Sequence, residues 1–337
     1  MVRPGPRNLI TDVDGILVGN AEDARAVTGA TVVLPDQPAV AAVDVRGGGP
    51  GTRETDLLDP AATVDSVHGI ALSGGSAFGL ATADGVMAWL AAHGRGFDVG
   101  GALVPLVPGA ILFDLNNSGD KNWGELPPYR ALGLKACEQA RRDFALGNAG
   151  AGLGARAGNI KGGLGSVSAI DDAGLQVGAL LAVNARGYAT MENQKQFWAW
   201  PFEQNGEFGN LPPPTSPVPL EVSVDRGGTA SGTVRGHTTI GVVATNARLS
   251  KSEARRVAIM AQDGLARAIR PIHTSFDGDA IFVLATGKLD LPGNRPLALS
   301  RLGSIAADCV ARACARGVYE AKSAGGMICW REHFADR

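Results

Sequence analysis

The stretch RGHTTIGVVATNARLSKSEARR, residues 235–256, decides how the chain is interpreted. Its apolar, β-branched run at 237–245 predicts a buried strand. Ser250, followed three residues later by Glu253, forms a capping box, which predicts that a helix begins there. The residues before the strand, 200–237, are rich in proline, glycine, serine and threonine and predict a mobile linker. A hydroxyl-bearing residue therefore stands where a linker meets a buried strand.

Composition narrows the class of protein. Hydrophobic residues make up 45% and charged residues 19% of the 337, which is normal for a soluble globular chain. The net charge of −2 gives no reason to expect a nucleic acid or an anionic membrane as partner. No apolar run is long enough to span a bilayer, and the start, MVRPGPRNLITDVDG, lacks the apolar part of a secretory signal. The four cysteines show no CxxC pairing, so we expect reduced thiols and a cytoplasmic protein.

The remaining pattern predicts sheets covered by helices. Residues 69–96 predict a strand, a glycine turn and a helix. Short apolar runs bounded by turn residues predict further strands at 30–35, 39–45, 106–115, 174–189 and 280–287. Helical patterns occupy 129–145, the residues after Ser250, and 297–321. Buried strands together with long helices predict an α+β arrangement.

Common catalytic and cofactor motifs are missing from the sequence. SGGSAFG (73–79) has Phe78 where a GxSxG motif needs its last glycine. There is no GxGxxG, Walker A or HExxH motif, and the five histidines are scattered. We therefore expect neither a metal nor an organic cofactor.

Thr238 has two interpretations. It can simply be a β-branched residue that opens a strand, which is the commoner situation. Alternatively, a threonine between a linker and a buried strand is the layout of a self-cleaving N-terminal nucleophile. Its hydroxyl would attack the carbonyl of His237, and the new chain would begin with Thr238. The released α-amine, with an ordinary pKa of about 7.7–8.0, could then act as the base for the hydroxyl.

Four blocks of the sequence resemble the DmpA-type aminopeptidase family, which includes β-peptidyl aminopeptidases and the nylon-oligomer endohydrolase. The blocks are, in order, 72–90, 110–116, 151–166 and 236–287. The resemblance implies a single domain over 1–337, folded as a four-layer αββα sandwich of the N-terminal-nucleophile type. It also implies self-cleavage into a large chain, 1–237, and a small chain, 238–337, and a homotetramer of the processed pairs.

The resemblance also assigns roles to individual residues. Thr238 matches the nucleophile, and His237 stands before it where the family often has asparagine or glycine. Asp277 and Asp279 match two acidic positions that would orient and tune the threonine; alternatively, DGD is a simple turn. Asn184 matches an asparagine whose side chain would donate to the oxyanion; alternatively, it closes a hairpin turn.

Two further positions depart from the pattern of the nylon-oligomer enzymes. Their lysine aligns with Asn159, and Lys161 lies two residues further on, on the same face of a strand. Lys161 could therefore serve as the site lysine; otherwise it is a surface residue. A tyrosine of those enzymes falls at Phe113, so one hydroxyl is missing.

The resulting hypothesis is a self-processing amidohydrolase that cleaves short peptides or aminoacyl amides through an acyl-enzyme on Thr238. An alternative is endohydrolysis of 6-aminohexanoate oligomers by the same chemistry. Acyl transfer, as in the similar ornithine acetyltransferases, lacks its ATML segment here. The last alternative is an unprocessed, non-catalytic binding protein in which His237 prevents cleavage.

Overall fold

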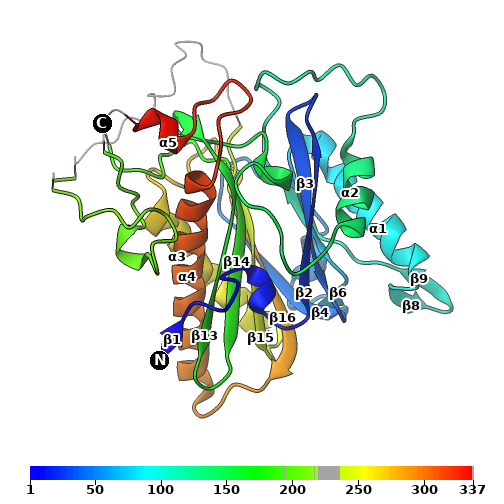
Figure 1. Ribbon diagram of the computed structural model, residues 1–337. Helices are drawn as coiled ribbons and strands as arrows, with labels where there is room; N and C mark the ends of the chain where they lie inside the picture. The colour runs from blue at the N-terminus through cyan, green and yellow to red at the C-terminus, as the bar shows by residue number, and fades with distance from the viewer. Residues whose placement is uncertain (193, 216, 219–235, 336–337) are drawn as a thin grey trace.

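Two β-sheets lie face to face in the computed structural model, and helices cover the outer face of each sheet (Figure 1). The structure describes residues 1–192, 194–215, 217–218 and 236–335. The resulting order of layers, helices, sheet, sheet and helices, confirms the αββα sandwich predicted from the sequence.

The larger sheet has seven strands. In spatial order these are β1 (Val2–Arg3), β13 (Gly163–Asp171), β14 (Gln176–Val183), β15 (Ile240–Ala247), β16 (Ala280–Leu289), β4 (Ala39–Val45) and β6 (Ser66–Val67). Strand β14 is antiparallel to β15, whereas β15 is parallel to β16. Helices α3 (Lys251–Ala268) and α4 (Arg295–Tyr319) cover the outer face of this sheet.

The smaller sheet has five strands and is covered by α1 (Thr82–Ala92) and α2 (Tyr129–Glu138). Its strands, in spatial order, are β2 (Ile16–Asp23), β3 (Thr28–Pro35), β7 (Ile70–Ser73), β10 (Gly109–Ile111) and β5 (Thr52–Arg53). Two short hairpins and a short α-helix lie outside these layers: β8 (Phe97–Val99) with β9 (Ala102–Val104), β11 (Arg156–Ala157) with β12 (Ile160–Lys161), and α5 (Trp330–His333). Within the described ranges, no helix combines the length and apolarity needed to cross a membrane.

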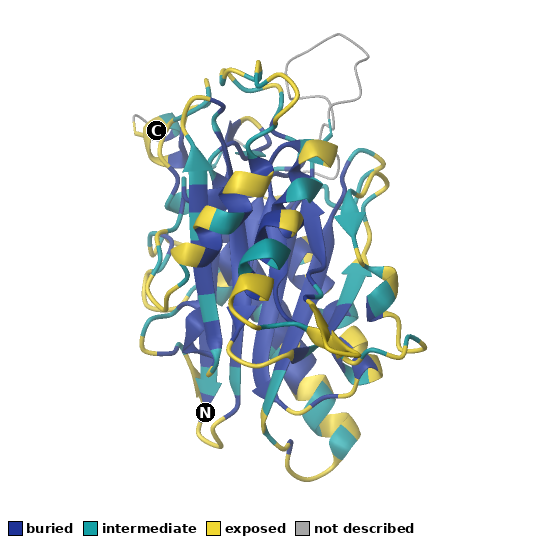
Figure 2. Ribbon diagram, turned by 90° about the vertical axis from the view of Figure 1, so that its right-hand side faces the viewer, coloured by how far each residue is buried: buried dark blue, intermediate teal, exposed yellow. Residues whose placement is uncertain are grey.

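Three apolar clusters hold the layers together. The inter-sheet cluster includes Leu180 and Val242 from the larger sheet and Leu72 from the smaller one. The other two clusters lie between each sheet and its helices. Because successive side chains of a strand point to opposite faces, Val242 packs between the sheets while Val243 packs against the helices. Figure 2 shows the result, with buried strands inside and exposed residues on the outer sides of the helices.

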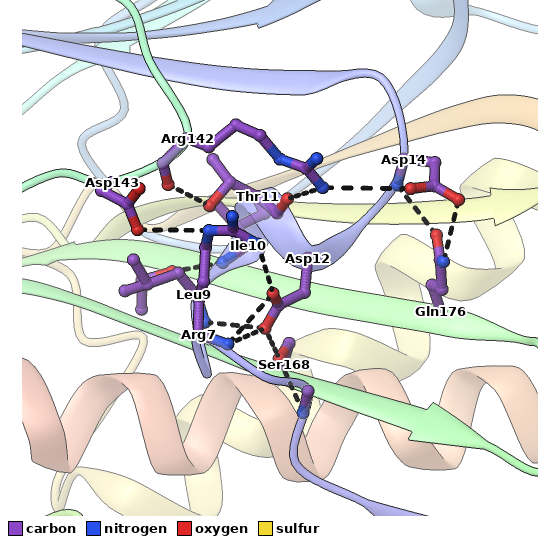
Figure 3. Close-up of polar contacts among 12 residues, drawn as sticks. Arg7, Leu9, Ile10, Thr11, Asp12, Asp14, Arg142, Asp143, Ser168 and Gln176 are labelled. Atoms are coloured by element: carbon purple, nitrogen blue, oxygen red, sulfur yellow. Dashed lines mark hydrogen bonds and ion pairs between the residues drawn. The ribbon is translucent and has the colours of Figure 1, made fainter.

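The N-terminal segment is fixed by a buried carboxylate (Figure 3). Asp12 accepts a hydrogen bond from the backbone N–H of Arg7 at 3.1 Å and from the Ser168 hydroxyl at 2.7 Å. The Arg7 guanidinium also contacts Asp143, at 3.2 Å. These contacts hold the segment against β13, so that Ile10 fills the inter-sheet cluster.

The segment before Thr238 differs from the expectation of a mobile linker over 200–237. Its described first part is packed: Phe208 is 1% exposed, and the Glu207 carboxylate lies 2.6 Å from the Arg312 guanidinium of α4. A buried ion pair and a buried aromatic ring fix this part to the helix layer. Residues 216 and 219–235 lie outside the described residues.

The capping box at the start of α3 is present as predicted. The Ser250 hydroxyl accepts the Glu253 N–H at 3.3 Å, and the Glu253 carboxylate accepts the Ser250 N–H at 2.9 Å.

We expect Ser250→Ala to lower the free energy of unfolding by about 1 kcal/mol, measured by urea titration, because an N–H group of the first turn loses its partner. Ser304→Ala, at an exposed position inside α4, is the control and should change stability by less than about 0.5 kcal/mol. Equal effects of the two substitutions would contradict the capping role.

Candidate active site

The topology of the larger sheet brings three chain segments to one edge. Strand β14 ends beside the start of β15, because the two are antiparallel. Strand β16 starts at the same edge, because it is parallel to β15. Asn184 follows β14, Thr238 precedes β15, and Asp277 and Asp279 precede β16. Four of the residues expected to form a site are therefore neighbours through strand order alone.

Thr238 is almost fully buried at this edge, with 3% exposed. Its backbone N–H donates to the carbonyl oxygen of Asn184 at 2.6 Å. Its hydroxyl donates to the carbonyl oxygen of His237 at 2.5 Å. The hydroxyl therefore lies against the peptide group that joins His237 to Thr238.

Backbone groups of the residues that precede β16 hold the same peptide group. The N–H of His237 donates to the Phe276 carbonyl at 3.0 Å, and the N–H of Gly278 donates to the His237 carbonyl at 2.9 Å. The His237 carbonyl oxygen thus accepts both a backbone N–H and the Thr238 hydroxyl. Donors at this oxygen would stabilise negative charge that develops there. This contact could not be predicted from residue types, because Gly278 contributes only its backbone N–H.

The two acidic residues bind different segments around Thr238. Both are fully buried. Asp279 Oδ1 accepts the N–H of Thr239 at 2.7 Å. Asp277 accepts the N–H and the hydroxyl of Thr274, at 2.8 and 2.5 Å. The Asp277 bonds close a turn over residues 274–277, and Asp277, Gly278 and Asp279 then run beside the His237–Thr238 peptide.

Asp277 and Asp279 also influence one another electrostatically. Burial raises the pKa of Asp277, and the nearby charge of Asp279 raises it further, while the Thr274 hydrogen bonds oppose the shift. Asp277 therefore keeps a proton more readily than an exposed aspartate would.

The Asn184 side chain connects the site to two loops. Its Nδ2 donates to the carbonyl oxygen of Phe113 at 3.0 Å, and its Oδ1 accepts the N–H of Arg156 at 2.9 Å. In the uncut chain the amide N–H of Asn184 therefore binds Phe113. The backbone N–H that binds the His237 carbonyl oxygen belongs to Gly278. The oxyanion role expected for Asn184 stays a prediction.

Lys161 is completely buried, so the interpretation as a surface residue does not apply. Its ammonium group donates to the carbonyl oxygens of Gly152 and Gly162, at 2.7 and 2.8 Å. Burial lowers its pKa to about 7, and the charge of Asp114 opposes this shift. Lys161 pairs across the β11–β12 hairpin with Arg156, whose N–H holds Asn184. The lysine is therefore linked to the site through that hairpin.

A pocket of about 150 Å³ opens beside the His237 peptide. Its walls include Phe113, Asp114, Arg156, Asn184, His237 and Met327. Asp114 is buried, and burial raises its pKa, although the Thr28 hydroxyl and the Gly75 N–H bind its oxygens at 2.6 and 2.8 Å. The pocket thus combines an aromatic wall with polar groups, which suits a small polar ligand. Within the described part of the chain, no cluster of histidine, cysteine, aspartate or glutamate is arranged to hold a metal ion.

Two sheets packed between helix layers match the fold of a solved aminopeptidase that is described as a variant among the Ntn hydrolase fold. A sequence profile of Peptidase family S58 matches residues 8–328, so the chain belongs to this family. The resemblance to the DmpA-type aminopeptidases is thereby confirmed.

Individual relatives agree with this assignment. An uncharacterized aminopeptidase of Mycobacterium tuberculosis is 45% identical, over 97% of this chain and 98% of the relative. A 6-aminohexanoate-oligomer endohydrolase of Kocuria sp. is 28% identical, over 90% of this chain and 84% of the relative. The solved L-aminopeptidase D-Ala-esterase/amidase of Ochrobactrum anthropi, described as a new variant among the Ntn hydrolase fold, superposes with a TM-score of 0.71 at 21% identity, covering 96% of this chain and 89% of that one. Hydrolysis of peptide or amide bonds is therefore the activity class of this chain.

The buried lysine predicts a characteristic pH dependence of stability. Between the folded pKa of Lys161, about 7, and the ordinary value of 10.5, the unfolded chain binds more protons than the folded one. The free energy of unfolding should therefore rise with pH in this window. In Lys161→Met this contribution is absent, so the difference in stability, wild type minus variant, should increase from pH 7 to pH 10. Urea titrations at several pH values measure it, and a difference that does not change with pH would contradict a buried lysine with a lowered pKa.

Proposed function

We propose that this chain is a self-processing N-terminal threonine amidohydrolase that cleaves short peptides or aminoacyl amides. The observation that carries the proposal is the contact of the Thr238 hydroxyl with the His237 carbonyl oxygen, at 2.5 Å. A nucleophile already held against the peptide bond it would attack gains the advantage of proximity. Membership of a peptidase family supports the reaction class.

Self-cleavage would proceed in two balanced steps. In the first, Thr238 Oγ1 attacks the carbonyl carbon of His237, the bond from that carbon to the Thr238 nitrogen breaks, and the nitrogen takes the hydroxyl proton. The His237 acyl group is then an ester on Thr238. In the second step, water hydrolyses this ester, which gives a carboxyl group on His237 and restores the hydroxyl. The N–H of Gly278, 2.9 Å from the His237 oxygen, would stabilise the negative charge in the first step.

Hydrolysis of a substrate would reuse the same hydroxyl. The α-amine released on Thr238 would accept the hydroxyl proton as the oxygen attacks the substrate amide. The departing amine would take that proton, and water would then release the acyl group. Lys161, as a buried cation or neutral amine in the neighbouring hairpin, and the Asp277–Asp279 pair would set the electrostatic field in which these protons move.

The second candidate is hydrolysis of 6-aminohexanoate oligomers by the same steps. The 28% identity with the Kocuria enzyme favours it. Phe113, which lines the pocket without a hydroxyl, favours a different substrate. Assays with aminoacyl 4-nitroanilides and with 6-aminohexanoate oligomers, run in parallel, distinguish the two candidates. Two further parts of the proposal are a homotetramer, which the family resemblance implies, and a cytoplasmic location, which rests on the cysteines without CxxC pairing.

Two adjacent threonines allow a matched test of the nucleophile. Thr238→Ala should abolish both chain cleavage and amide hydrolysis, because no hydroxyl remains to attack. Thr239→Val is the control: the Thr239 hydroxyl is buried and hydrogen-bonds to none of the described residues, so its loss should leave both activities close to wild type. Cleavage is measured by denaturing gel and hydrolysis by release of 4-nitroaniline. Activity that survives in Thr238→Ala would exclude Thr238 as the nucleophile, and a wild-type chain that is neither cut nor active would favour a binding protein.

Two glycines allow a matched test of the hydroxyl position. A Cβ atom on Gly278 would lie 2.7 Å from Thr238 Oγ1 and 2.6 Å from the Gly49 carbonyl oxygen. Gly278→Ala should therefore displace the hydroxyl and slow self-cleavage by about tenfold or more. Gly49→Ala, in the facing loop, is the control, because its Cβ would meet its nearest neighbour, the Asp277 carbonyl oxygen, at 3.8 Å. Equal cleavage rates in the two variants, followed in cell-free translation, would contradict the importance of this position.

A further inference from the structure

His273 stands out beside the site because the reaction described above does not use it. It belongs to the turn that precedes Asp277 and Asp279. Its backbone has a φ of 56°, the left-handed region that histidine adopts only occasionally. Such a conformation costs free energy and persists where neighbouring contacts hold it.

Both the side chain and the backbone of His273 bind one oxygen of Asp279. The imidazole Nδ1 lies 2.9 Å from Asp279 Oδ2, and the His273 backbone N–H donates to the same oxygen at 3.2 Å. The left-handed backbone brings both donors to one carboxylate oxygen. The contact fixes the ring so that Nδ1 carries a hydrogen and faces Asp279, because a carboxylate only accepts.

Asp279 passes this orientation on to the start of β15. Its other oxygen, Oδ1, accepts the N–H of Thr239 at 2.7 Å. Thr239 directly follows the nucleophile, so the chain of contacts runs from His273 through Asp279 to the backbone beside Thr238. Since Asp279 is fully buried, its carboxylate cannot exchange these partners for water.

We propose that His273 is a positioning residue for the reaction of Thr238. By binding Asp279 Oδ2 through Nδ1, it keeps Asp279 Oδ1 on the Thr239 N–H and so fixes the direction in which the Thr238 hydroxyl points. This inference rests on the proposed function, because it concerns the same nucleophile. His273 itself contacts neither the hydroxyl nor the His237 peptide in the described hydrogen bonds, so its effect passes through Asp279.

Two substitutions separate the side-chain contact from the backbone conformation. His273→Asn keeps a donor close to the position of Nδ1, and asparagine tolerates the left-handed region. His273→Gly accepts the same backbone without strain but has no side-chain donor. Both variants keep the backbone N–H that binds Asp279, so they differ in the side-chain contact under test.

The test compares rates of self-cleavage for the full chain made by cell-free translation, together with the thermal unfolding midpoint of each purified variant. We expect His273→Asn to be cut within about threefold of the wild-type rate, and His273→Gly to be cut about tenfold more slowly, since a hydrogen bond to a charged group is lost. In the processed protein, kcat for an aminoacyl 4-nitroanilide should fall in His273→Gly while KM stays near the wild-type value.

Equal rates for His273→Gly, His273→Asn and the wild type would overturn the inference. The inference would also be overturned if His273→Gly is cut slowly, its unfolding midpoint is lowered to match, and His273→Asn does not restore the rate. That pattern would indicate a contact that only stabilises the fold. The failure of the proposed function looks different: cleavage would then persist in Thr238→Ala, or be missing from the wild type.

Discussion

The hydrogen bonds between residues 237–239 and 276–280 position the peptide on which the site depends. The N–H of His237 binds the Phe276 carbonyl, the N–H of Gly278 binds the His237 carbonyl, and the N–H of Ala280 binds the Thr239 carbonyl. These bonds continue the parallel pairing of β15 and β16 beyond the ends of the two strands. A displaced register would move Gly278 and Asp279 away from the His237–Thr238 peptide. The pairing of β15 with β16 therefore also fixes the geometry of the site.

The sandwich explains why this register is so well defined. Strands β15 and β16 are buried on both faces, by the smaller sheet on one side and by α3 and α4 on the other. A slip by one residue would exchange the faces of Val242 and Val243, and every neighbouring contact would change with them. Burial also sets the electrostatics of the site: it raises the pKa of Asp277, and in the neighbouring β11–β12 hairpin it lowers the pKa of Lys161, because both groups are removed from water.

The sequence predicted the layers and the main elements well, because periodicity and turn residues are local signals. The strand expected at 39–45 is present as β4, and the helix expected after Ser250 begins there. Boundaries were less accurate: the helix expected over 129–145 ends at Glu138, after which Arg141 pairs with Val18. The packed part of the linker was missed because its composition does not reveal that Glu207 meets a buried arginine on α4.

The side chains of the candidate site could be predicted from the sequence, whereas its backbone contacts could not. Thr238, Asn184 and the two aspartates were singled out through a family resemblance, and the strand topology brings them to one edge. The Gly278 N–H and the His273–Asp279 contact follow from parallel register and from a left-handed backbone, which leave no recognisable pattern in the sequence.

The intact mass and the N-terminal sequence of the purified protein test the central claim most directly. The account predicts two fragments that remain associated, the smaller of which begins with Thr238. A single uncut chain, or a cut at any other peptide bond, would contradict it.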